Sequence, residues 1–186
     1  QALAVLVEID TFGGLVNPAV RIRDMLLESA VPTICYVKYR AWSAGALIAL
    51  ANQHIVIAPG GSIGAAEPVP ATEKTVAALR AEFAATAGRW ERNPRIAEAM
   101  VDKSLGLSGY AEPGQILALT GSQARELGYA DTVASERSEV VSFYGLAPER
   151  VEEYSLSAQD RTVGFFAQPG VRAVLLIILF FISSLL

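Results

Sequence analysis

The chain has 186 residues, of which 52% are hydrophobic and only 18% are charged, and its net charge is −4. This length suggests one domain with an appendage, and the acidic balance without a Lys/Arg cluster argues against a nucleic-acid partner. Cys35 is the only cysteine, which excludes an internal disulfide framework and a cysteine-based metal cage.

The first half of the sequence alternates between strand-like and helix-like segments. Strands are expected at 3–9, 31–39 and 54–59, with helices at 20–28 and 43–52 between them. The strands are rich in Val, Leu and Ile, which is typical of buried parallel strands. The order therefore predicts an α/β fold with a parallel sheet and right-handed crossovers.

The second half is expected to be more helical. Helices are expected at 72–92, 94–107 and 120–128, a strand at 116–119 and a strand-like run at 140–146. Thr72 is an expected helix N-cap, and Pro94 suits the first turn of the helix that follows it.

The C-terminal end of the sequence is strongly apolar. Residues 174–186 carry no charge, and this run is apolar on every face, so it predicts the start of a truncated transmembrane helix. A buried core helix is the alternative. We therefore divide the chain into a folded domain at 1–158, an amphipathic lead-in at 159–170 and the start of a membrane segment at 171–186.

Ser43 is the first candidate for chemistry. It follows a predicted strand and begins a helix, so its hydroxyl lies near free backbone N–H groups that can stabilise an oxyanion. Small residues follow it in "SAGA" and leave room for a substrate carbonyl. An ordinary N-cap with close helix packing is the alternative, and the tetrapeptide alone favours it.

Gly13 and Gly14 strengthen the case for a site at Ser43. They follow the first strand at its carboxyl end, where sites form in parallel sheets, and Ser43 follows the next strand. The two turns are thus expected to face each other, one with a nucleophile and one with N–H donors. A tight turn that requires positive φ is the alternative for the glycines, and both roles are compatible.

The base that would activate Ser43 is less obvious. His54, the only histidine, is about eleven mainly helical residues away, roughly 15 Å, and is expected to be structural. Lys74 follows a glycine-rich turn and could act as a base if burial kept it neutral. A surface lysine beside Glu73 is an equally good interpretation.

These segments resemble a known family. "VEIDTFGG", "WSAGALIALANQHIVIAPGGSIGAAEPV" and "TEKTV" with "IAEAMVD" are similar to the NfeD family of membrane-bound, ClpP-class serine proteases, which are related to signal peptide peptidase A. The resemblance runs from about Val5 to Ala134. It implies a ClpP/crotonase-like domain of ββα repeats at 1–158, with the hydrophobic tail leading into the membrane.

The resemblance also implies roles for individual residues. Ser43 would be the nucleophile and Lys74 the base of a Ser-Lys dyad, and Gly13, Gly14 and the N–H of Ala44 would hold the oxyanion. Phe12 departs from the pattern, because many members have proline there, and it is expected to alter the turn or the substrate groove. The short loop between Pro68 and Lys74 leaves open whether the dyad assembles without substrate.

The function implied by the resemblance is endoproteolysis at the cell membrane. Expected substrates are hydrophobic segments of membrane-associated proteins, such as stomatin- or flotillin-like partners, with no metal or other cofactor. Membrane lipid contact, a homo-oligomer and an extracytoplasmic protease domain are also implied. Two alternatives stay open: a non-catalytic membrane scaffold for such a partner, and a crotonase-type acyl-CoA enzyme, for which no CoA site was found.

Overall fold

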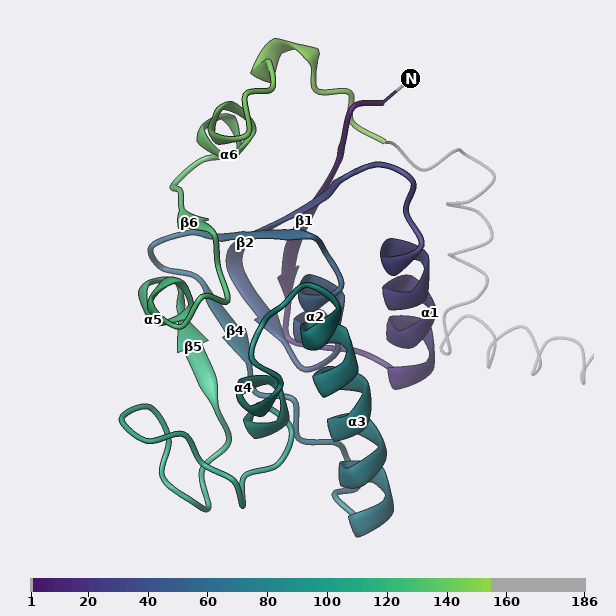
Figure 1. Cartoon of the computed structure of the whole chain (residues 1–186), viewed down its shortest axis with the longest axis vertical. Coiled ribbons are helices and arrows are strands. Elements are labelled where there is room, and N and C mark those ends of the chain that lie inside the picture. The colour runs from purple at the N-terminus through teal and green to yellow at the C-terminus, as the bar shows by residue number, and fades with distance from the viewer. Residues whose placement is uncertain (1, 155–186) are drawn as a thin grey trace, which may run out of the picture. The chain divides into compact units, whose positions relative to one another are not determined.

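The computed structural model describes residues 2–154, and Figure 1 shows the arrangement of their helices and strands. In chain order the elements are β1 (Val5–Thr11), α1 (Val16–Leu27), β2 (Thr33–Trp42), α2 (Ala44–Leu50), β3 (His54–Ile57), β4 (Ser62–Gly64), α3 (Glu73–Arg89), α4 (Pro94–Ala99), β5 (Ala118–Thr120), α5 (Gly121–Glu126), β6 (Thr132–Val133), α6 (Arg137–Phe143) and the 3₁₀ turn η1 (Pro148–Arg150). None of the helices in this described range is long and apolar enough to cross a membrane. The predicted lead-in at 159–170 and membrane segment at 171–186 lie outside it.

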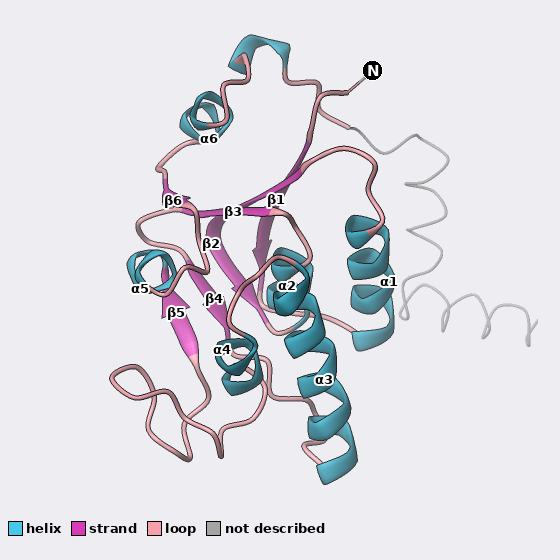
Figure 2. Cartoon of the chain, viewed as in Figure 1, coloured by secondary structure: helices cyan, strands magenta, loops and turns pink. Residues whose placement is uncertain are grey.

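The strands form one sheet with β2 at its centre (Figure 2). β1 pairs along most of β2 in parallel, from Thr33 to Ala41. On the other side of β2, its first half pairs with β3 and its second half with β4, also in parallel. At one edge of the sheet, β5 pairs with β4 in the antiparallel direction, and at the other edge β6 pairs with β3 in parallel. The sheet is therefore mixed rather than wholly parallel, and β4 is a short strand where the sequence suggested only a glycine-rich turn.

Both faces of β2 are buried, because successive side chains of a strand point to opposite sides. Cys35 and Val37 pack with residues of α2, α3 and α4, whereas Ile34 and Tyr36 pack with Val140 of α6. Figure 1 shows α6 well apart from α1, α2 and α3. This arrangement explains why the first half of the β2 sequence is a nearly continuous hydrophobic run.

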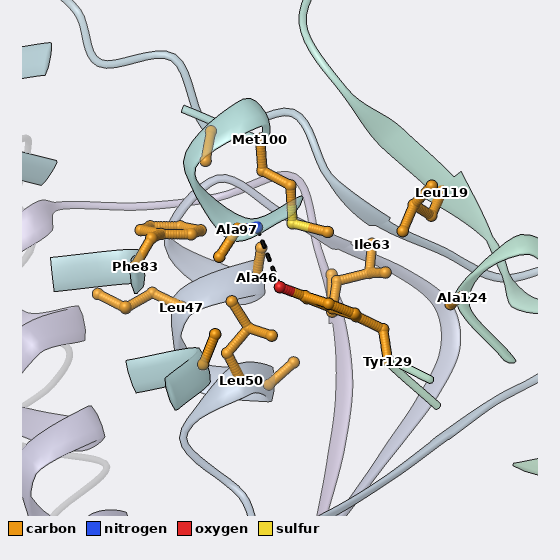
Figure 3. Packing of buried hydrophobic residues seen from close by; sticks show 14 of the residues in the cluster. Ala46, Leu47, Leu50, Ile63, Phe83, Ala97, Met100, Leu119, Ala124 and Tyr129 are labelled. Carbon is orange, nitrogen blue, oxygen red and sulfur yellow. Dashed lines mark hydrogen bonds between the residues drawn. The ribbon is translucent and has the colours of Figure 1, made fainter. Parts of the chain in front are cut away.

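The larger core cluster packs α2 against the sheet and against α3 and α4. Figure 3 shows Leu47 and Leu50 of α2 packed among Phe83, Met100 and Tyr129. The Tyr129 hydroxyl accepts a hydrogen bond from the Ala97 N–H at 3.0 Å and donates one to the Asn93 carbonyl, so this buried polar group is satisfied. Burial raises the pKa of Tyr129.

Two expected elements differ in the structure. The helix predicted at 94–107 ends at Ala99, because the carbonyls of Ala99 and Met100 accept hydrogen bonds from the N–H groups of Leu117 and Ala66 and cannot continue a helix. The strand-like run at 140–146 lies mostly in α6, where Val140 and Val141 are both buried. The predicted N-cap at Thr72 is confirmed, with Thr75 completing a capping box.

Candidate active site

Ser43 lies in a strained turn between β2 and α2. Its φ of 54° and ψ of −119° are rare for a residue with a side chain. The Ser43 N–H donates to the Gly64 carbonyl of β4 at 2.9 Å, and its own carbonyl accepts from Ala46 at 3.0 Å. The backbone is therefore fixed from two sides.

The Ser43 hydroxyl does not cap α2. Ser43 occupies the N-cap position, but its side chain makes no capping hydrogen bond. Within residues 2–154 it has no hydrogen-bond partner at all, although the residue is half-buried. The simple N-cap interpretation of the sequence is therefore wrong for the side chain, and the hydroxyl is free.

The two turns predicted to face each other do so. A Cβ atom added to Gly13 would lie 2.8 Å from Ser43 Cβ and 3.2 Å from Ser43 Oγ. One added to Gly14 would lie 3.9 Å from the Ala44 Cβ. Gly13 also has a φ of +132°, so both its conformation and its space require glycine.

The backbone N–H groups of this site differ in availability. The Gly13 N–H donates to Thr11 Oγ1 at 3.1 Å, and the same hydroxyl donates to the Gly13 carbonyl at 3.1 Å. The N–H groups of Gly14 and Ala44 have no acceptor in the described part of the chain. For Ala44 this is expected, because it is the first residue of α2. Gly13 thus provides space beside Ser43, whereas Gly14 and Ala44 provide free donors.

Lys74 lies in the first turn of α3. It is the second residue of α3, and its side chain is exposed. The capping box of Thr72 and Thr75 fixes this first turn, and Thr75 also donates to the Pro70 carbonyl at 2.7 Å. No hydrogen bond joins Lys74 to Ser43 among the residues described.

His54 lies at the opposite edge of the sheet from Ser43. It begins β3, beside the start of β2, whereas Ser43 follows the end of β2. Its Nδ1 is 3.3 Å from Asp131 Oδ2, which also accepts the Tyr144 hydroxyl at 2.9 Å. The structural role expected for His54 is consistent with these contacts. No group of three His, Cys, Asp or Glu residues within 2–154 is arranged to hold a metal.

Two residues that hold α2 were missed by the sequence analysis. Arg92 is 7% exposed, and its guanidinium donates to the carbonyls of Leu50, the last residue of α2, and of Asn52 and Gln53 just after it, at 3.3, 3.1 and 2.9 Å. Trp90 Nε1 donates to the Ala51 carbonyl at 2.9 Å. Burial lowers the pKa of Arg92. No local pattern signals these contacts, because the partners lie about forty residues apart.

Comparison with known proteins identifies relatives of this chain. It is 34% identical over 182 residues to the membrane protein NfeD1b of Bacillus subtilis, covering 95% of this chain and 42% of that protein. It is 31% identical over 154 residues to the membrane-bound protease PH1510 of Pyrococcus horikoshii, covering 76% of this chain and 32% of that protein. The chain therefore spans less than half the length of these curated relatives.

Solved structures of a stomatin-specific protease, 1510-N, share the fold. A serine-to-alanine mutant of it matches with a TM-score of 0.66 and 30% identity, over 76% of this chain and 69% of that one. A lysine-to-alanine mutant in complex with a substrate peptide matches with a TM-score of 0.71 and 25% identity, over 89% and 83%. The mixed α/β sheet is thus similar to that protease domain.

The family match covers most of the chain. The family described as "NfeD1b, N-terminal domain" matches residues 1–154, which include every element of the described structure. This chain therefore belongs to the family of NfeD1b N-terminal domains.

Proposed function

We propose that this chain is the protease domain of a membrane-anchored serine endopeptidase, with Ser43 as the nucleophile and Lys74 as the base. The observation that carries the proposal is the close approach of Gly13 to the side chain of Ser43, whose hydroxyl has no hydrogen-bond partner among the described residues. The N–H groups of Gly14 and Ala44, in the same two turns, are also unpaired within that range. The relatives named as proteases support it, and so do their serine and lysine mutants.

The free donors suit an oxyanion hole. When Ser43 Oγ attacks a peptide carbonyl, negative charge develops on the carbonyl oxygen, and two backbone N–H groups in fixed positions stabilise it. Gly14 and Ala44 are the donors in this proposal. Gly13 keeps the approach to Ser43 open, because any side chain there would collide with the serine.

Lys74 completes the reaction in this proposal. In its neutral form it takes the proton of Ser43 and then gives it to the departing amine, leaving an acyl-enzyme that water hydrolyses. Because Lys74 is exposed and unbonded to Ser43 here, we propose that the dyad assembles when substrate covers the site. A covering peptide would exclude water and favour the neutral amine.

The proposed substrates are hydrophobic segments of stomatin- or flotillin-like membrane proteins. The relative named as stomatin-specific supports this class, and the names of both curated relatives support a location at the cell membrane. Large apolar side chains lie exposed close to the catalytic residues in sequence: Leu15 follows the glycine pair, and Val69 precedes Lys74. A homo-oligomer in contact with lipid, with this domain on the extracytoplasmic side, and a reaction without cofactors complete the proposal.

Labelling of the full chain with a fluorophosphonate tests the nucleophile. We expect covalent labelling that disappears in Ser43→Ala and persists in the control Ser108→Ala, which changes an exposed serine. Labelling that survives in Ser43→Ala would reject Ser43. Absence of any labelling or peptide turnover would favour the scaffold alternative.

Turnover of an apolar peptide tests the base. We expect Lys74→Ala to lose at least ~100-fold in rate, as for a general base, and Lys38→Ala, another exposed lysine, to keep the rate. Equal rates in Lys74→Ala and the unmodified chain would reject the dyad.

A further inference from the structure

An aromatic pair joins the two turns of the candidate site. Phe12 directly precedes Gly13, and Trp42 directly precedes Ser43. Their ring centroids lie 5.5 Å apart with an interplanar angle of 76°, an edge-to-face contact. Such pairs are stabilising beyond the apolar area that they bury. The contact therefore links the glycine turn to the nucleophile turn.

Both rings are held in place by further contacts. Trp42 Nε1 donates to Ser62 Oγ of β4 at 2.8 Å. The Arg40 guanidinium lies 4.5 Å from the centroid of the Phe12 ring, and its Nε is 3.1 Å from Asp10 Oδ1. Since Asp10 balances the charge of Arg40, this side of the ring does not offer an unpaired cation to a substrate.

Phe12 is nevertheless 69% exposed. Large aromatic side chains are usually buried, and this ring could gain stability by covering its apolar surface. Instead, its contacts with Trp42 and Arg40 hold it in the open, and it directly precedes Gly13, which lies against Ser43. A fixed apolar surface of this kind binds a ligand without losing side-chain entropy.

We infer that Phe12, packed against Trp42, forms the wall of an apolar subsite that accepts a bulky aliphatic or aromatic side chain next to the scissile bond. The inference rests on the proposed function and adds a specificity-determining residue to it. A bulky apolar side chain would cover the open part of the Phe12 ring. A charged side chain would lose hydration there without gaining a partner.

Cleavage of a mixed peptide library by the full chain tests the subsite. Mass spectrometry of the products gives the residues that flank each cut. We expect Leu, Met and Phe to be favoured at one flanking position, and Phe12→Ala to reduce their preference over Ala about tenfold. Phe12→Leu should keep most of the preference. Met25→Ala is the matched control, because Met25 is 73% exposed on α1, and it should leave the preference unchanged.

Fluorophosphonate labelling separates this inference from the proposed function. We expect Ser43-dependent labelling of the unmodified chain whatever side chain the subsite prefers, because the probe is too small to need a side-chain subsite. An unchanged cleavage preference, or an equal loss of rate for every peptide, would overturn the subsite and leave the protease proposal standing. No Ser43-dependent labelling in the unmodified chain would overturn the proposed function itself.

Discussion

The two ends of α2 are bonded in opposite ways. At the carboxyl end, Trp90 and Arg92 donate to four consecutive carbonyls, those of residues 50–53. At the amino end, the hydroxyl of Ser43 and the N–H of Ala44 have no partner in the described part of the chain. Every helix leaves unpaired groups at both ends. Here the carboxyl end is saturated and anchors the helix, whereas the groups at the amino end are unpaired within residues 2–154.

The largest expected effect follows from removing the anchor. Arg92→Leu would leave three carbonyls without their charged donor, two of them in buried hydrogen bonds, so we expect the free energy of unfolding to fall by about 3–5 kcal/mol. Chemical denaturation measures the change. Arg95→Leu, which alters an exposed arginine, is the control and should stay within about 0.5 kcal/mol. A loss below about 1 kcal/mol for Arg92→Leu would mean that the saturated end does not anchor α2.

The open end should respond in activity more than in stability. In Gly13→Ala the new methyl group would lie 2.8 Å from Ser43 Cβ, so we expect at least ~100-fold slower fluorophosphonate labelling. Its positive φ adds about 1–3 kcal/mol of backbone strain. Gly109→Ala separates the two effects, because Gly109 also has positive φ but open space around it. That control should lose stability and keep its labelling rate; equal labelling losses in both variants would contradict the role of Gly13.

The strain at Ser43 predicts a variant that is more stable but inactive. Glycine tolerates the backbone angles of residue 43, and the serine hydroxyl contributes no hydrogen bond to any of residues 2–154, so Ser43→Gly should raise the free energy of unfolding by about 1 kcal/mol. Ser43→Ala keeps the strain and serves as the control. Denaturation of both variants isolates the backbone effect. If Ser43→Gly were the less stable of the two, the turn would not be strained.

The sequence predicted the placement of Ser43 against Gly13 and Gly14 because parallel strands determine it. Two apolar strands joined by a helix must bring their carboxyl ends to one edge of a sheet, so the turns that follow them meet. The free state of the Gly14 N–H could not be predicted, since it depends on Thr11 bonding Gly13 instead.

The regions that the sequence could not predict depend on distant partners. Val140 and Val141 have β-branched side chains, which favour a strand locally, but burial of this segment against the second face of β2 fits a helix. Arg92 bonds carbonyls about forty residues upstream, and no short pattern records such a contact. The position of Lys74 depends on the loop before α3, whose path is not set by any hydrophobic periodicity.

The smallest expected effect concerns Cys35, whose thiol is enclosed on β2, unlike the hydroxyl of Ser43. Burial raises the pKa of Cys35 from 9.0 to about 12, although the charge of Arg92 opposes this shift. The folded state therefore keeps the proton that the unfolded state releases above pH 9. Stability from this source is complete below pH 9 and is lost as the pH rises toward 12.

Denaturation at pH 9 and pH 10 measures this alkaline loss. We expect the free energy of unfolding to fall by about 1 kcal/mol more in the unmodified chain than in Cys35→Ala over that interval. Tyr129 and Tyr144, whose pKa values are also raised by burial, titrate in both chains and cancel in the difference. The same burial should protect the folded thiol from iodoacetamide at pH 8, because the thiolate is the reactive form. Rapid alkylation of the folded chain would show that water reaches Cys35, and the contrast with Ser43 would then fail.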